Sequence, residues 1–249
     1  MTARVTITRP DLHNAFNEAV IEELTTAFEG VGADEGVRCA VLAGEGKSFC
    51  AGADVHWMKR MVGYSVEENV ADAGAMARML RAIRDCPKPV IARVHGPAIG
   101  GGVGLTAACD IAAATASAVF SLSEVKLGII PAVISPFVME KIGVGAMRRY
   151  GLTAERFDAA EARRLGLVHE VFETVEALDA WIGKLCETIR GNSPKALAAC
   201  KRVLTEVSGV RWDEAQALTA RRIADIRVSP EGQEGLKAFL EKREPGWVK

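Results

Sequence analysis

The sequence lacks a surplus of charge of either sign. Its 249 residues include 31 Lys or Arg and 32 Asp or Glu, so the formal net charge at pH 7 is −1. Proteins bind nucleic acids largely through clustered cations that neutralise phosphates. The balanced charge therefore argues against a nucleic-acid-binding function.

Long apolar runs are also absent. The longest apolar stretch without a charged side chain, residues 94–109, has 16 residues and contains a proline and five glycines. A membrane helix needs about 20 apolar residues, so we expect no membrane span. Residues 1–11 contain no apolar signal core, and we expect a cytoplasmic protein.

The six cysteines and four histidines form no metal or disulfide pattern. The cysteines are scattered without a C-x-x-C pair, which favours reduced thiols, and the histidines have no ligand spacing. The motifs of phosphate loops, dinucleotide-binding folds, zinc proteases and serine hydrolases are all missing. We therefore expect no metal site and none of these activities.

Strands and helices alternate in the first half of the chain. The hydrophobic patterns predict strands at residues 3–8, 37–43 and 90–94, and helices at residues 14–31, 71–83 and 103–109. This alternation indicates an α/β fold with a parallel sheet. Beyond residue 140 helix starts dominate, so we divide the chain into a core at residues 1–190 and a helical C-terminal region at residues 191–249.

Glycine is abundant, and it gathers in two loops. The chain has 24 glycines, and the loops at residues 48–54 and 99–102 each follow a predicted strand and lead into a predicted helix. Such loops present backbone N–H groups with no side chain in the way, and a helix N-terminus adds partial positive charge. One glycine run alone favours tight packing, whereas the pair predicts an oxyanion hole.

The ensemble of motifs resembles the enoyl-CoA hydratase/isomerase (crotonase) superfamily along nearly the whole chain. The matching pieces are Arg9-Pro10, Asn14-Ala15, Phe49 to Asp54, Lys88 to Ala92, Gly96, Gly100 to Gly102, Cys109-Asp110, Ser123-Glu124, Leu127 to Pro131, Ala159 to Val168 and Phe239 to Arg243. The resemblance implies a crotonase (ClpP/crotonase-like) spiral of ββα units with a helical C-terminal trimerisation region. It also implies a homotrimer or a hexamer.

The same resemblance assigns roles to individual residues. The N–H groups of Ala53 and Gly101 would hold the oxygen of an acyl-CoA thioester and stabilise the enolate that forms from it. The remaining residues implied in binding substrate or coenzyme A are Ala51, Gly52, Asp54, Val55, Trp57, Met58, Gly100, Gly104 and Lys242. No cofactor is implied, because coenzyme A is part of the substrate. Lys242 would meet the CoA phosphates, in its own or a neighbouring subunit.

Glu124 is the predicted catalytic acid. It follows the β-like segment 119–122 and precedes an apolar run, within the pattern S-E-x-x-L-G-x-x-P. A carboxyl group in a poorly hydrated pocket has a raised pKa, which suits proton transfer near neutral pH. A single glutamate is more often a solvated surface residue, and only this pattern favours the catalytic role.

Gly104 departs from the pattern of two-acid hydratases, which carry a glutamate at this position. With Glu124 as the single acid, either one carboxylate serves both proton transfers of hydration, or the reaction is a 1,3-proton shift that needs no water. The sequence therefore leaves two reactions open, hydration and Δ3,Δ2-enoyl-CoA isomerisation. A non-catalytic CoA-binding protein is a third reading.

Several segments resemble the bacterial methylglutaconyl-CoA hydratase branch, which acts in leucine and isovalerate breakdown. They are residues 53–61, 102–105, 130–136 and 152–157. We therefore predict hydration of a short branched 2-enoyl-CoA, with 3-methylglutaconyl-CoA as the best single substrate. Its second carboxylate calls for a cation, and the candidates by position are Lys59, Arg60 and Lys126, although surface exposure is the more common state of such side chains.

Overall fold

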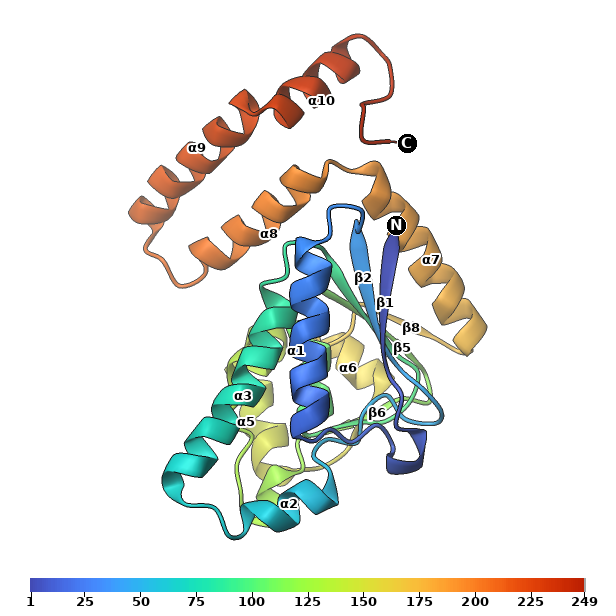
Figure 1. The fold of residues 1–249 in the computed structure, drawn as a ribbon, viewed down its shortest axis with the longest axis vertical. Helices are drawn as coiled ribbons and strands as arrows, with labels where there is room; N and C mark the ends of the chain where they lie inside the picture. Colours follow the sequence, from blue (N-terminus) through green and yellow to red (C-terminus); the bar gives the residue numbers. More distant parts are fainter. Residues whose placement is uncertain (249) are drawn as a thin grey trace.

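The computed structural model describes residues 1–248 and contains two β-sheets surrounded by helices (Figure 1). The larger sheet is parallel throughout, in the order β1-β2-β3-β5-β8. Its strands are β1 (Thr2–Ile7), β2 (Cys39–Gly44), β3 (Val90–Val94), β5 (Ile111–Thr115) and β8 (Glu170–Phe172). The smaller sheet, in the order β4-β6-β7, contains β4 (Ala98–Ile99), β6 (Val119–Ser121) and β7 (Phe157–Asp158). The predicted α/β class with a parallel sheet is confirmed.

Helices cover both faces of the larger sheet. Side chains alternate across a strand, so Ala40 and Leu42 of β2 face the cluster that contains α1 and α3, whereas Cys39 and Val41 face α7. The helices are α1 (Glu18–Ala33), α2 (Val55–Met61), α3 (Val66–Arg84), α4 (Gly101–Ala108), α5 (Ser135–Thr153), α6 (Ala159–Leu165) and α7 (Val175–Gly191). Two 3-10 helices, η1 (Pro10–Leu12) and η2 (Glu124–Leu127), interrupt the loops.

The last three helices extend away from the sheets. They are α8 (Pro194–Val207), α9 (Trp212–Val228) and α10 (Pro230–Leu240). Figure 1 shows α9 and α10 at the end of the molecule opposite α2. Ser193 and Ser229 cap α8 and α10 as their sequences predict, each ahead of a proline. The division of the chain at residue 191 stays a prediction.

Two helices begin four or five residues away from the predicted start. The helix predicted to begin at residue 14 begins at Glu18, because the Asn17 side chain accepts a hydrogen bond from the N–H of Val20 and caps it. Phe16 instead lies in extended backbone and forms a parallel bridge with Ala53. The helix predicted from residue 71 begins at Val66, where Ser65 and Glu68 form a capping box.

No helix within residues 1–248 has both the length and the apolar character needed to cross a membrane.

Candidate active site

A cavity of about 520 Å³ lies between the two glycine-rich loops, α2, α3, η2 and the segment that leads into α5. Its lining is mostly apolar. The lining residues are Phe16, Ala51, Gly52, Ala53, Trp57, Met58, Met61, Asn69, Asp72, Ala73, Met76, Gly100, Gly101, Ser123, Glu124, Leu127, Ile129, Ile130, Pro131, Ala132, Val133 and Ile134. The structure thus gathers segments that are far apart in the sequence around one cavity.

Backbone hydrogen bonds hold the two glycine-rich loops side by side. Cys50 and Ala98 form a parallel bridge, and the N–H of Ile99 donates to the carbonyl of Cys50 over 2.9 Å. Gly52 has a φ of +88°, and a Cβ at this position would lie 2.9 Å from the carbonyl oxygen of Ile99. Only glycine tolerates both this backbone conformation and this approach.

The N–H groups of Ala53 and Gly101 are available to a ligand. Within residues 1–248, neither of them donates a backbone hydrogen bond. Gly101 is the first residue of α4, so its N–H has no intrahelical acceptor and lies at the positive end of the helix dipole. Both residues line the cavity, which gives the two donors that an oxyanion hole requires.

Glu124 opens η2 and borders the cavity beside Gly100. A Cβ at Gly100, whose φ is +53°, would lie 3.1 Å from Oε1 of Glu124. Its other oxygen, Oε2, is buried and has no hydrogen-bond partner among the described residues. Burial raises the pKa of the Glu124 carboxyl group. The side chain therefore has the raised proton affinity that the sequence predicted for a general acid.

Gly104 lies in the core and does not line the cavity. It is buried in α4, where an added Cβ would overlap Cγ2 of Ile134 and lie 2.9 Å from its Cβ. Ile134, not residue 104, contributes to the cavity wall. The prediction that Gly104 contacts substrate finds no support in the cavity, because a side chain from the start of α5 fills the surroundings of this residue.

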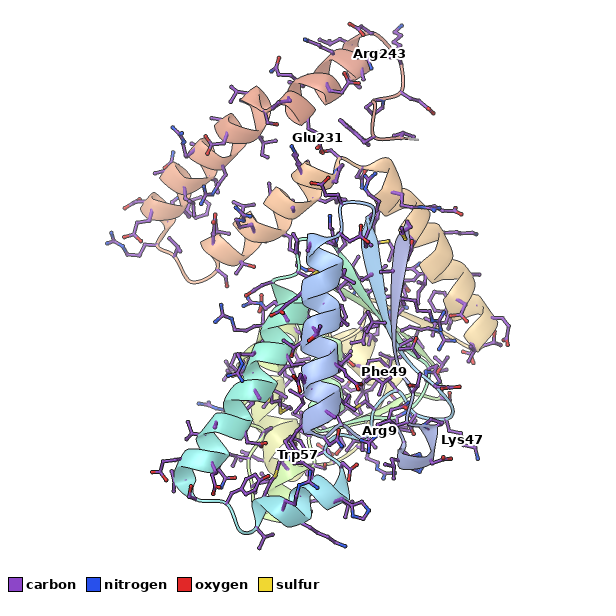
Figure 2. The ribbon with its side chains drawn as sticks, in the orientation of Figure 1. Arg9, Lys47, Phe49, Trp57, Glu231 and Arg243 are labelled. Atoms are coloured by element: carbon purple, nitrogen blue, oxygen red, sulfur yellow. The ribbon has the colours of Figure 1, made fainter. Side chains whose placement is uncertain are left out.

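Three further predicted binding residues lie outside the lining of the cavity. Asp54 caps α2 through the N–H of His56 and pairs with Arg9 at 2.7 Å. Val55 is exposed on the first turn of α2. Lys242 follows α10, and Figure 2 places its neighbour Arg243 at the end of the molecule opposite Trp57. Lys242 therefore does not reach the cavity of its own chain.

The candidate cations also lie outside the lining. Lys59 and Lys126 are exposed, and Arg60 pairs at the surface with Glu18 at 2.6 Å. No Lys, Arg or His lines the cavity in the part of the chain that the structure describes. The cavity of one subunit thus offers no cation to a second substrate carboxylate.

The sequence prediction missed the face of α3 that borders the cavity. Asn69, Asp72, Ala73 and Met76 share this face because they are spaced by three and four residues. Asp72 accepts a hydrogen bond from Nε1 of Trp57 over 3.1 Å, and burial raises the pKa of its carboxyl group. The helical spacing was visible in the sequence, but it does not show which side of the helix meets the cavity.

Comparison with known proteins identifies the fold and the family. The family model for enoyl-CoA hydratase/isomerase matches residues 2–249. An enoyl-CoA hydratase structure from Shewanella pealeana is 44% identical, covers 99% of this chain and 92% of its own, and superposes with a TM-score of 0.95. AtuE of Pseudomonas aeruginosa is 37% identical over 100% of this chain and 96% of its own, also with a TM-score of 0.95.

A peroxisomal Δ(3,5)-Δ(2,4)-dienoyl-CoA isomerase from Arabidopsis thaliana is 33% identical over 98% of this chain and 91% of its own length. The relatives thus include proteins named as hydratases and as isomerases. Nearly complete coverage by the family model agrees with the cavity, the paired glycine-rich loops and the buried glutamate. The chain therefore belongs to the enoyl-CoA hydratase/isomerase (crotonase) family of enzymes and has the crotonase fold.

Proposed function

We propose that this enzyme adds water reversibly to the double bond of a short branched 2-enoyl-CoA. The observation that carries the proposal is the unpartnered, buried Oε2 of Glu124 in a cavity that also holds the free N–H groups of Ala53 and Gly101. A general acid and base and an oxyanion hole are the two elements that proton transfer next to a thioester requires.

In the proposed mechanism the thioester oxygen accepts hydrogen bonds from Ala53 and Gly101. Glu124 takes a proton from water as the water oxygen bonds to the β-carbon, and the double-bond electrons move toward the thioester oxygen to give an enolate. Glu124 then returns a proton to the α-carbon, so water is added in full and the carboxylate is regenerated. Loss of one oxyanion donor typically slows such reactions by about 100- to 1,000-fold.

The acyl group is the finer part of the proposal. The branch resemblance favours 3-methylglutaconyl-CoA, whereas the lining within residues 1–248 contains two acids and no cation. If the second carboxylate of the substrate loses its hydrating water in this cavity without gaining a cation or a hydrogen-bond donor, the affinity for the substrate falls. The geometry therefore favours the matched uncharged substrate, 3-methylcrotonyl-CoA, and both compounds belong in the test.

Isomerisation is the second candidate, and the packing of Gly104 favours it. Because Ile134 fills the space next to residue 104, one carboxylate has to serve both steps of hydration, whereas a 1,3-proton shift needs only one. Relatives named as dienoyl-CoA isomerases are also among the similar proteins.

We also propose that the enzyme is a cytoplasmic homotrimer or a dimer of trimers. The exposed apolar side chains of the last helices support assembly, since Trp212, Phe239 and Leu240 are each more than three-quarters exposed in one chain. In such an assembly Lys242 is available to the CoA of a neighbouring subunit. Sedimentation of the purified protein tests the oligomeric state.

The test of function follows the loss of enoyl-thioester absorbance and the incorporation of ¹⁸O from labelled water. Crotonyl-CoA, 3-methylcrotonyl-CoA and 3-methylglutaconyl-CoA serve as hydration substrates, and a 3-enoyl-CoA tests isomerisation. Labelled 3-hydroxyacyl-CoA supports the hydratase, and conversion of the 3-enoyl-CoA without label supports the isomerase. No hydration of any of the three 2-enoyl esters would exclude the proposed reaction. Glu22→Gln, on an exposed face of α1, is the control for Glu124→Gln.

A further inference from the structure

The cavity contains a second carboxylate that the proposed mechanism does not use. Asp72 reaches the lining from α3, and Oδ1 accepts a hydrogen bond from Nε1 of Trp57 on α2. Figure 2 shows Trp57 where α2 approaches the loops of the core. The two acids of the cavity, Glu124 and Asp72, therefore come from different elements.

A series of side-chain contacts connects Asp72 to the oxyanion site. A Cβ at Gly101 would overlap the ring of Phe16, whose centroid lies 5.9 Å from that of Trp57, and Trp57 in turn bonds Asp72. Along α3, Met76 lies next to Gly101, with its Cε 3.1 Å from the position of that Cβ. Asp72 precedes Met76 by four residues, or about 6 Å along the helix axis. Asp72 therefore borders the cavity about one helical turn away from the oxyanion site.

No cation compensates the charge of Asp72. It forms no ion pair within residues 1–248, and the cavity lining contains no basic side chain. The nearby Arg60 is engaged by both carboxylate oxygens of Glu18 at the surface. Among residues 1–248, Trp57 donates the one side-chain hydrogen bond that the Asp72 carboxylate accepts.

We infer that Asp72 is a specificity-determining residue that excludes acyl groups with a second negative charge and thereby selects uncharged acyl groups. The inference rests on the proposed function, because that function places the acyl group of a CoA thioester in this cavity. Two like charges about 6–8 Å apart in a partly buried site weaken binding by about 10- to 100-fold.

Calorimetric binding of two saturated esters tests this inference without turnover. Isovaleryl-CoA and 3-methylglutaryl-CoA share the same branch and the same CoA, and they differ by the terminal carboxylate. We expect the wild-type protein to bind isovaleryl-CoA at least about ten-fold more tightly. Equal binding, tighter binding of 3-methylglutaryl-CoA, or no binding of either ester would overturn the inference.

Asp72→Asn removes the charge and keeps an acceptor for Trp57. We expect it to bind 3-methylglutaryl-CoA about ten-fold or more tightly than the wild type does, with the affinity for isovaleryl-CoA within about two-fold. Trp57→Phe removes the hydrogen bond but keeps the charge, so the preference for the uncharged ester should persist. Glu67→Gln removes an exposed charge of the same helix and should leave the preference unchanged.

The outcomes separate the two proposals. A preference for the uncharged ester that Asp72→Asn abolishes supports the role of Asp72 even if no enoyl-CoA is hydrated. A preference that Asp72→Asn leaves intact overturns this role even if hydration is rapid. If Asp72→Asn does not fold, Asp72→Ser makes the same comparison, because it also removes the charge and keeps a side-chain oxygen that can accept a hydrogen bond.

Discussion

Adding one methyl group at Gly104 should destabilise the protein measurably, although the site is helical. Its Cβ would overlap Cγ2 of Ile134, which is 1% exposed, and would contact Leu80, which is 0% exposed. Neither Ile134 nor Leu80 can move into solvent, and overpacking of this kind typically lowers the free energy of unfolding by about 1–3 kcal/mol. Alanine is the better helix former by about 1 kcal/mol, which opposes the cost. We therefore expect Gly104→Ala to lower the free energy of unfolding by up to about 2 kcal/mol, the difference between these two effects.

Urea denaturation at fixed protein concentration measures this effect. Ile134→Ala alone should lower the free energy of unfolding by about 2–5 kcal/mol. In the double variant Gly104→Ala/Ile134→Ala, the space that the isoleucine side chain leaves should accept the new methyl group. The double variant should therefore be more stable than the sum of the single effects predicts, by about 1 kcal/mol or more. Gly183→Ala is the matched control, because a Cβ at this position of α7 meets nothing within 4 Å.

The control Gly183→Ala should be as stable as the wild type or slightly more stable, because alanine is the better helix former. If Gly104→Ala behaves like Gly183→Ala, or if the effects of Gly104→Ala and Ile134→Ala simply add, then Ile134 does not occupy the space beside residue 104. The explanation for the missing second acid would then be wrong.

Other consequences of the site can be tested with three further variants. Glu124→Gln should lower kcat by about 100- to 10,000-fold while Glu22→Gln keeps wild-type activity, and a smaller loss would show that Glu124 does not transfer the proton. Because burial raises the pKa of Glu124, the folded state binds its proton more tightly than the unfolded chain does, so ionisation of this group costs stability as the pH rises. The unfolding free energy of Glu124→Gln relative to the wild type should therefore increase from about pH 4 to about pH 7, and a difference that stays constant would contradict the raised pKa. Gly52→Ala should lower the free energy of unfolding by about 1–2 kcal/mol, because alanine is strained in the left-handed conformation of Gly52. The same substitution should displace the N–H of Ala53, so kcat should fall together with stability. Gly104→Glu should be less stable than Gly104→Ala and should not raise the rate of hydration, as a rate assay on folded protein would show.

Much of the site was predictable because its signals are local in the chain. The two glycine-rich loops each follow a strand, and the backbone conformations at Gly52 and Gly100 require glycine wherever the loops lie. Glu124 was predicted from the family-like pattern around it, and the structure places it half-buried at the cavity. Strand β3 was predicted with the bounds that the structure shows, since apolar residues mark it on both sides of Arg93.

One error was local, since the capping box of Ser65 and Glu68 that starts α3 was visible in the sequence, whereas others concern contacts between segments that are distant in sequence. The helix expected from residue 14 begins later, because Phe16 pairs with Ala53 across the chain and Asn17 provides the cap. Lys242 was predicted to meet the CoA phosphates in its own or a neighbouring subunit, and it follows α10, which lies far from the cavity of the same chain. Neither outcome can be derived from hydrophobic periodicity, which reports only which face of a segment is apolar.

The sequence by itself determined the parallel α/β class, the two loops that offer bare backbone, and the single glutamate that can exchange a proton. These follow from strand patterns, glycine conformation and residue chemistry, which act over a few neighbouring residues. Only the tertiary structure decided that Ile134 fills the space beside Gly104, and that Asp72 borders the cavity while no cation within residues 1–248 does. The physical reason is that close packing, and the balance of charge inside a cavity, depend on side chains that the fold brings together from separate helices.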